Sequence, residues 1–197
     1  RVKGPNITPG YWRAPDLTAK AFDEEGYYCF GDALRPADPN DLSAGFLFDG
    51  RTAENFKLDT GTWVSTGALR TRFIDHFGGL ARDVAIAGAD RPYLSAIVFP
   101  DVEALRTISG LGKDATPADI YADDKVRAAM GGKLSTLAKE ATGSSNRVRK
   151  MILAEDPPDF ASGEQTDKGS INQRMVLSRR QELVDELYSD SPRVISI

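Results

Sequence analysis

The spacing of hydrophobic and polar residues changes near residue 50. Residues 1–49 are rich in glycine, proline, asparagine and aspartate, and their apolar residues gather in two short extended pieces, EGYYCFGDAL and GFLFDG. Extended pieces between turn-forming residues predict hairpins. The first region is therefore predicted to be β-rich.

From Arg51 to about Pro100 the pattern predicts an α+β core. The order expected is a strand, a helix that begins at Ser65 or Thr66 as its N-cap, and two more strands; the four segments are TAENFKL, STGALRTRFIDHF, DVAIAG and LSAIVF. Further helices are predicted at DVEALRTI, DDKVRAAMGGKLSTLAKEA and SNRVRKMI.

A final helix is expected from about Ile171 to Tyr188. Its apolar residues fall on one stripe, which predicts that it packs against the body of the domain; they are Val176, Leu177, Leu183, Val184 and Leu187. A connector that contains proline and glycine, AEDPPDFASGEQTDKGS, precedes it.

Composition and charge exclude several classes of function and site. The chain has 25 basic and 29 acidic residues and a net charge of -4, so it has no overall positive field for nucleic acid or an anionic membrane. One cysteine and one histidine exclude an internal disulfide framework and a cysteine-rich or histidine metal centre. No apolar run reaches the roughly 18 residues of a membrane span. We expect a cytoplasmic protein, and the abrupt start without methionine suggests a fragment.

Three features resemble reactive sites, but a structural role is the favoured interpretation of each. The segment SGLGKD at 109–114 lacks the glycine spacing of a phosphate-binding loop and is expected to be a turn. His76 lies at a predicted helix end, where a satisfied surface histidine is favoured over a catalytic base. Cys29, between aromatic residues, is predicted to be a small buried hydrophobe.

A series of spaced motifs carries more specific information. In order they are GYW at 10–12, Thr18, Phe22, GYYCFGD at 26–32 and GR at 50–51. This series resembles the late core motifs of the adenylate-forming (AMP-binding) enzymes, the acyl- and aryl-CoA ligases. Within this family, the segments NFKLDTGTWVSTGALR and TDKGSINQRMVLSRRQELVDELY most resemble the feruloyl-CoA synthetases in sequence. The resemblance to the family covers essentially the whole chain.

The resemblance implies a fold and an activity. Residues 51–197 would form the small mobile C-terminal α+β domain, a short mixed sheet flanked by helices, and residues 1–50 the β-rich end of the large adenylation domain. Such enzymes convert a carboxylate and ATP into an acyl-adenylate and pyrophosphate, then transfer the acyl group to CoA and release AMP. The implied partners are a small aromatic acid, ATP, CoA, Mg²⁺ bound with the ATP, and a missing N-terminal domain of the same chain. The isolated chain is expected to be inactive.

Two residues are expected to bind the nucleotide. Asp32 follows Gly31 at the end of a predicted strand, where a carboxylate can accept both ribose hydroxyls, as acidic residues do in dinucleotide folds. Arg51 matches the arginine of the family's Gly-Arg motif, and its fixed fork of donors suits phosphate oxygens. The alternatives are a solvated turn aspartate and a salt-bridged arginine.

The segment after Arg51 resembles the family's hinge and CoA loop. The hinge position, usually aspartate, is Ala53 here, and Glu54 is expected to take over part of its polar role. The loop includes Gly61, Thr62 and Trp63. Gly61 would allow close approach of the backbone to the pantetheine, and Trp63 would line its channel, with core packing as the alternative.

Lys168 is expected to be the adenylation lysine. A cation is needed where charge develops on the α-phosphate and carboxylate oxygens. The family's lysine column falls on Ser170, so Lys168 is displaced by two residues, and the alternative is a solvated Lys168 with Arg174 in its place.

Two other functions stay open. The chain could be a non-catalytic binding or regulatory domain, or it could adenylate an acid for a carrier-protein thiol or for reduction, as in carboxylic acid reductases. An enzyme of the last kind is expected to have a carrier domain after Ile197, and the short tail SDSPRVISI resembles a natural end, so the CoA ligase is the expected function.

Overall fold

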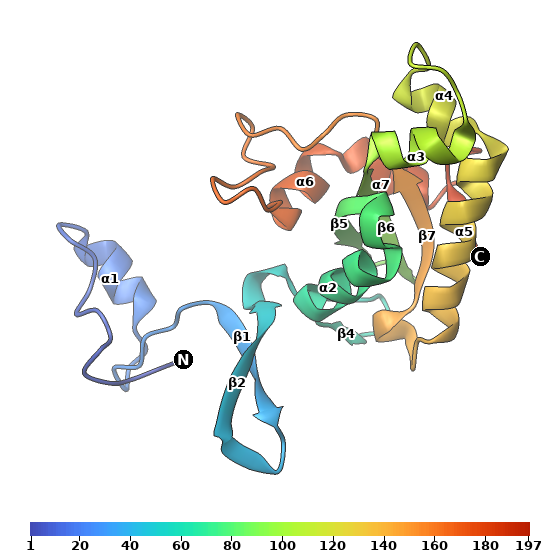
Figure 1. Cartoon of the computed structure of the whole chain (residues 1–197). Helices are drawn as coiled ribbons and strands as arrows, with labels where there is room; N and C mark the ends of the chain where they lie inside the picture. The colour runs from blue at the N-terminus through green and yellow to red at the C-terminus, as the bar shows by residue number, and fades with distance from the viewer. The chain divides into compact units, whose positions relative to one another are not determined.

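The computed structural model describes residues 1–197, which form two compact units (Figure 1). The first unit is Arg1–Ala53 and the second is Glu54–Ile197. No helix in either unit has the length and apolar character needed to cross a membrane.

The first unit contains one helix and one β-hairpin. Helix α1 is Pro15–Ala21, with proline at its start, and was not predicted from the sequence. Strands β1 (Asp32–Asp38) and β2 (Asp41–Arg51) pair antiparallel, so a hairpin is present as predicted. Only the last three residues of the predicted piece EGYYCFGDAL lie in β1, and Asp32 begins this strand instead of following one.

This unit has no hydrophobic core of its own. The buried hydrophobic residues of the chain begin only at Leu58, whereas Trp12 is 87% exposed and Phe48 64% exposed. The prediction that Cys29 is buried is wrong, because Cys29 is exposed. Its backbone N–H pairs with the carbonyl of Ala21, and no second layer of structure within the unit covers its side chain.

The second unit is built on a four-stranded mixed sheet. Its strands are β5 (Ala81–Ala87), β6 (Leu94–Pro100), β7 (Val148–Leu153) and β8 (Ile195–Ser196), in that order. The central pair β6–β7 is parallel, and β5 and β8 add antiparallel edges. A separate ribbon pairs β3 (Phe56–Lys57) with β4 (Trp63–Val64).

Helices cover both faces of this sheet (Figure 1). One face packs on α2 (Thr66–Phe77), α3 (Val102–Ser109), α4 (Pro117–Ala122) and α5 (Asp124–Lys139), and the other on α6 (Gln173–Arg179) and α7 (Gln181–Leu187). Along β6, Ala96 and Val98 belong to the first core while Ile97 and Phe99 belong to the second, as the period of two in a strand requires. The α+β prediction is confirmed.

Three element predictions needed correction. SNRVRKMI was predicted as a helix, but Val148–Leu153 is the strand β7, buried between β6 and β8. The final helix is divided at Arg180, whose backbone leaves the helical region, although its predicted stripe does pack in the core. The strand predicted at TAENFKL is only β3, preceded by the 3₁₀ turn η1 (Thr52–Glu54).

Candidate active-site elements

Asp32 and Arg51 lie together at one end of the β1–β2 hairpin. They are direct partners in its register. The carbonyl of Gly31 accepts from the backbone N–H and the hydroxyl of Thr52, at 2.8 and 2.9 Å, which holds this end closed. Arg51 is exposed and takes part in none of the chain's salt bridges, so its guanidinium is free within this unit.

The predicted hinge residues lie where the two compact units meet along the chain. Ala53 ends the first unit and Glu54 begins the second, and both lie in the 3₁₀ turn η1. Ala53 is exposed, while the Glu54 side chain is only 10% exposed and lies 3.7 Å from a guanidinium nitrogen of Arg70 on α2. Within the second unit the backbone carbonyl of Glu54 also accepts from the Thr66 hydroxyl at 2.8 Å.

The predicted CoA loop is the tight turn of the β3–β4 ribbon. The N–H of Gly61 donates to the carbonyl of Leu58, and the N–H of Leu58 donates to the carbonyl of Thr62. Gly61 has φ +80°, which favours glycine. Trp63 is 55% exposed, so the alternative that it packs in the core is wrong.

Lys168 lies at the tip of a second turn with the same construction. The N–H of Gly169 donates to the carbonyl of Thr166, and the N–H of Thr166 donates to the carbonyl of Ser170. Gly169 has φ +82°, and Gln165 and Ile171 pair as an isolated antiparallel bridge below the turn. Lys168 is exposed, on a defined hairpin rather than on a loose connector.

The two turns share a short sequence pattern that is separate from the motif series above. They are DTGT at 59–62 and DKGS at 167–170, each an aspartate, one variable residue, a glycine of positive φ and a hydroxyl residue. A type I turn followed by a left-handed glycine is a common three-residue hairpin connection. The pattern therefore predicts a rigid hairpin tip at both places.

A buried ion pair anchors the Lys168 hairpin. Glu164 is 4% exposed at its side chain and receives two hydrogen bonds from Arg180, at 2.9 and 2.7 Å. The same guanidinium donates to the carbonyls of Asp156 and Pro157 and lies over the ring of Phe99. Hydrogen bonds from Arg180 hold the pKa of Glu164 below its usual value, against the opposing effect of burial.

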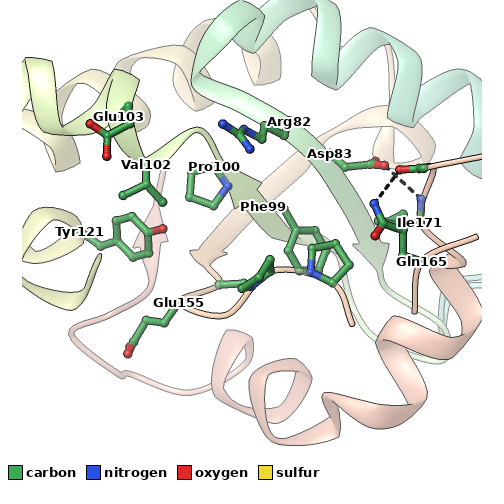
Figure 2. Close-up of a pocket in the computed structure, with 14 residues that line it drawn as sticks. Arg82, Asp83, Phe99, Pro100, Val102, Glu103, Tyr121, Glu155, Gln165 and Ile171 are labelled. Carbon is green, nitrogen blue, oxygen red and sulfur yellow. Dashed lines mark hydrogen bonds between the residues drawn. The ribbon is translucent and has the colours of Figure 1, made fainter. Parts of the chain in front are cut away.

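The other end of the hairpin is tied to the sheet. The N–H of Ile171 donates to Asp83 of β5 at 3.3 Å, and the second carboxylate oxygen of Asp83 accepts from Arg70 at 2.8 Å. Figure 2 shows Asp83 and Ile171 joined at one side of a cavity.

This cavity, of ≈ 560 Å³, lies between the hairpin, the end of β6 and helices α3 and α4. Its wall includes Phe99, Pro100 and Gly169, and the hydroxyl of Tyr121 points into it (Figure 2). That hydroxyl is buried and has no hydrogen-bond partner in the chain. Burial, with a smaller effect from Glu155, raises the pKa of Tyr121 to about 12, so the group stays neutral and can donate.

Two of the remaining candidates, His76 and the segment SGLGKD, have the structural roles that the sequence predicts. The imidazole Nε2 of His76 lies 2.9 Å from the carbonyl of Lys133, a satisfied structural position, and SGLGKD is the turn that follows α3. Arg174 is exposed on α6. The chain contains no group of three or more His, Cys, Asp or Glu residues placed to hold a metal ion.

The sequence reading missed the side chains that position the hairpin. These are Arg70, Asp83, Glu164 and Arg180, whose partners lie 13 to 88 positions away. Charged residues at such separations look like ordinary surface positions in a sequence, and only the fold reveals that they are paired and largely buried.

Comparisons with known proteins extend over nearly the whole chain. No family model matches it. A carboxylic acid reductase of Segniliparus rugosus is 30% identical over 191 residues, which cover 95% of this chain and 14% of that protein. A peroxisomal acyl-CoA ligase, number 891, of Penicillium brevicompactum is 26% identical over 199 residues, 96% of this chain and 28% of the ligase.

Solved structures show similarity to the same kinds of protein. The A domain of the Segniliparus rugosus carboxylic acid reductase, in complex with AMP and a co-purified carboxylic acid, matches with a TM-score of 0.71 and 30% identity over 94% of this chain and 27% of that one. The chain thus spans about a seventh of the length of the first reductase relative and about a quarter of its adenylation domain.

Proposed function

We propose that this chain, which belongs to the adenylate-forming superfamily of acyl-CoA ligases and carboxylic acid reductase adenylation domains, is the C-terminal part of an acid–thiol ligase. The observation that carries the proposal is the similarity to an AMP-bound adenylation domain along almost the whole chain. In the first half-reaction a carboxylate attacks the α-phosphate of ATP, giving an acyl-adenylate and pyrophosphate. In the second, a thiol displaces AMP from the acyl carbon and a thioester forms.

Residues 1–53 act in this proposal as the end of the large adenylation domain. Exposed apolar side chains such as Phe46 and Phe48 need a partner surface to leave water, and the unit itself offers no core. The rest of the large domain is the partner we propose, and it would supply the phosphate loop and the acid pocket.

Asp32 and Arg51 have complementary tasks at the nucleotide. The carboxylate of Asp32 accepts from ribose hydroxyls, and the free guanidinium of Arg51 donates to ribose or phosphate oxygens. Their direct pairing in the hairpin register keeps an acceptor and a forked donor side by side.

The second unit supplies a different hairpin tip to each of the two half-reactions. Lys168 brings an ammonium to the α-phosphate and carboxylate oxygens as negative charge develops there. The β3–β4 turn, with Gly61, Thr62 and Trp63, lines the path of the CoA thiol in the other half-reaction. The unit turns about Ala53 and Glu54 between the two, because a few residues at a domain junction can absorb such a change.

We further propose that the acid is a hydroxycinnamate and the acceptor thiol is that of CoA. The support is the resemblance of NFKLDTGTWVSTGALR and TDKGSINQRMVLSRRQELVDELY to the feruloyl-CoA synthetases.

A second candidate is the adenylation domain of a carboxylic acid reductase. It is favoured by the 30% identity to the Segniliparus rugosus protein, whose adenylation domain has also been solved together with a carrier domain. In that case a carrier-protein thiol, rather than CoA, receives the acyl group.

One product assay separates these candidates. The full-length enzyme is incubated with ATP, CoA and ferulate, and in parallel with ATP, NADPH and ferulate without CoA. AMP and feruloyl-CoA in the first mixture alone support the ligase. An aldehyde that depends on NADPH supports the reductase, and the absence of AMP in both mixtures with ferulate, coumarate, caffeate and benzoate would contradict adenylation of these acids.

A further inference from the structure

Arg70 connects two places that the proposed reaction uses. It lies on α2 with its side chain 15% exposed, between Glu54 at the start of the second unit and Asp83 on β5. Its Nη2 donates to Asp83 at 2.8 Å, its Nε donates to the carbonyl of Val84 at 2.9 Å, and its Nη1 lies 3.7 Å from Glu54. One rigid guanidinium therefore fixes three groups.

Asp83 passes this constraint to the Lys168 hairpin. One of its oxygens accepts from Arg70, and the other accepts from the N–H of Ile171, the residue that closes the hairpin opposite Gln165. Figure 2 shows this contact beside the base of the hairpin. A contiguous series therefore runs from Glu54 through Arg70 and Asp83 to Ile171.

Burial makes these contacts stronger than surface ion pairs. The side chains of Glu54, Arg70 and Asp83 are 10%, 15% and 16% exposed. Charges in such surroundings interact through a lower effective dielectric than in water. Removing the central guanidinium would leave two carboxylates without their common partner.

The contact at Glu54 is the weakest of the series. At 3.7 Å it is an ion pair without a hydrogen bond, whereas the contacts of Arg70 with Asp83 and Val84 are hydrogen bonds. A change of backbone torsion at residues 53–54 would alter it first.

We propose that Arg70 is a positioning residue. It holds the Lys168 hairpin in place through Asp83, and it contacts the proposed hinge through its ion pair with Glu54. The inference rests on the proposed function, because it takes Lys168 as the adenylation lysine. Arg70 touches neither substrate nor nucleotide in this account, and it acts by fixing where the lysine is held.

The test uses the full-length enzyme and measures the two half-reactions separately. Arg70→Met keeps the apolar stem and removes the guanidinium, while Arg72→Met, on the same helix, removes the more exposed contacts of Arg72 with the carboxylate and the backbone carbonyl of Glu140. We expect Arg70→Met to lower the rate of acyl-adenylate formation about tenfold, since small displacements of a reacting group reduce rates steeply. Thioester formation from supplied acyl-adenylate, and both rates in Arg72→Met, should stay within about twofold.

A double-variant cycle tests whether Arg70 acts through Lys168. In a Lys168→Ala background, Arg70→Met should cause no further loss of adenylation. A full tenfold further loss, or an equal loss of both half-reactions, would overturn the positioning role.

Hydrogen–deuterium exchange of residues 164–172 gives a readout independent of activity. Exchange there should be faster in Arg70→Met and unchanged in Arg72→Met. Should Arg70→Met fail to fold, Asp83→Asn serves instead, because Arg70 and Ile171 donate to different oxygens of Asp83, and the NH2 group that replaces one of these oxygens cannot accept a hydrogen bond.

Unchanged exchange in Arg70→Met, or in Asp83→Asn if it is the variant used, overturns the inference. If Lys168→Ala retains adenylation but exchange rises as expected, the lysine assignment fails while the tether stands.

Discussion

Asp32 and Arg51 face each other as register partners at the end of the β1–β2 hairpin that lies opposite its turn. The turn that follows, η1, begins at the next residue, Thr52, which donates two hydrogen bonds back to Gly31. The proposed nucleotide-binding pair is therefore fixed directly before the proposed hinge, and motion at residues 53–54 can leave the pair undisturbed.

Replacing either member of this pair should weaken ATP binding. In the full-length protein, Asp32→Asn removes a charge and one acceptor, and Arg51→Lys removes the forked arrangement of donors. We expect each to raise KM for ATP by about tenfold, the loss of a hydrogen bond to a charged group. Asp38→Asn, at the other end of the same hairpin, should leave KM for ATP unchanged. An equal effect of all three variants would mean that the hairpin matters only as structure.

Trp63 should affect only the second half-reaction. It is exposed beside the β3–β4 turn, so Trp63→Ala leaves the core intact. We expect KM for CoA to rise about tenfold while the rate of acyl-adenylate formation is unchanged, because the contact between Trp63 and the pantetheine of CoA is used only in thioester formation. Phe160→Ala removes another exposed aromatic side chain, 63% exposed, and serves as the control. An unchanged KM for CoA in Trp63→Ala contradicts the loop assignment.

Gly169 should be the sensitive glycine of the Lys168 hairpin. Its φ of +82° is unfavourable for any residue with a Cβ, although no atom lies within 4 Å of where that Cβ would be. Gly169→Ala should therefore lower the free energy of unfolding of the hairpin by about 1 kcal/mol through backbone strain alone. Hydrogen exchange of residues 165–171 measures it. Gly112→Ala, at an equally open position without a positive φ, should cause no such change, and equal exchange in both variants would contradict the turn described.

The Glu164–Arg180 pair should make stability depend on pH in the acid range. Because hydrogen bonds from Arg180 lower the folded-state pKa of Glu164, its contribution is complete above the unfolded value of about 4.3 and is lost as pH falls through the folded value. At pH 7, Glu164→Gln should lower the free energy of unfolding by about 3 kcal/mol.

Urea unfolding of the 197-residue chain at pH 7 and at successively lower pH checks this expectation. The difference between wild type and Glu164→Gln should shrink as the solution becomes more acidic. A difference that stays constant with pH would show that the ionised carboxylate of Glu164 is not what stabilises the hairpin.

Local patterns predicted much of the second unit. The helix after Ser65 and the strands that became β5 and β6 follow directly from periodicity and are present as expected. SNRVRKMI failed because its short apolar run is compatible with both a helix and a buried strand, and pairing with Leu94–Val98 decided for the strand. The break at Arg180 coincides with a long-range ion pair to Glu164, and no local pattern in the sequence predicts it.

The two turn tips show what sequence can give at the site. The shared Asp-x-Gly-hydroxyl pattern predicts both hairpins, whereas the buried contacts of Glu54, Arg70 and Asp83 depend on three separate elements coming together. Cys29 was misjudged for a related reason, since local hydrophobicity does not say whether a second layer covers a residue.

The most direct test of the central claim is the effect of Lys168→Ala on the separated half-reactions of the full-length enzyme. Removing one electrostatic stabiliser of developing charge should slow acyl-adenylate formation by about 100-fold or more. Thioester formation from supplied acyl-adenylate should continue at the wild-type rate, and Lys113→Ala, an exposed lysine on another turn, should change neither rate. Full adenylation by Lys168→Ala, together with its loss in Arg174→Ala, would contradict the assignment and transfer the role to Arg174.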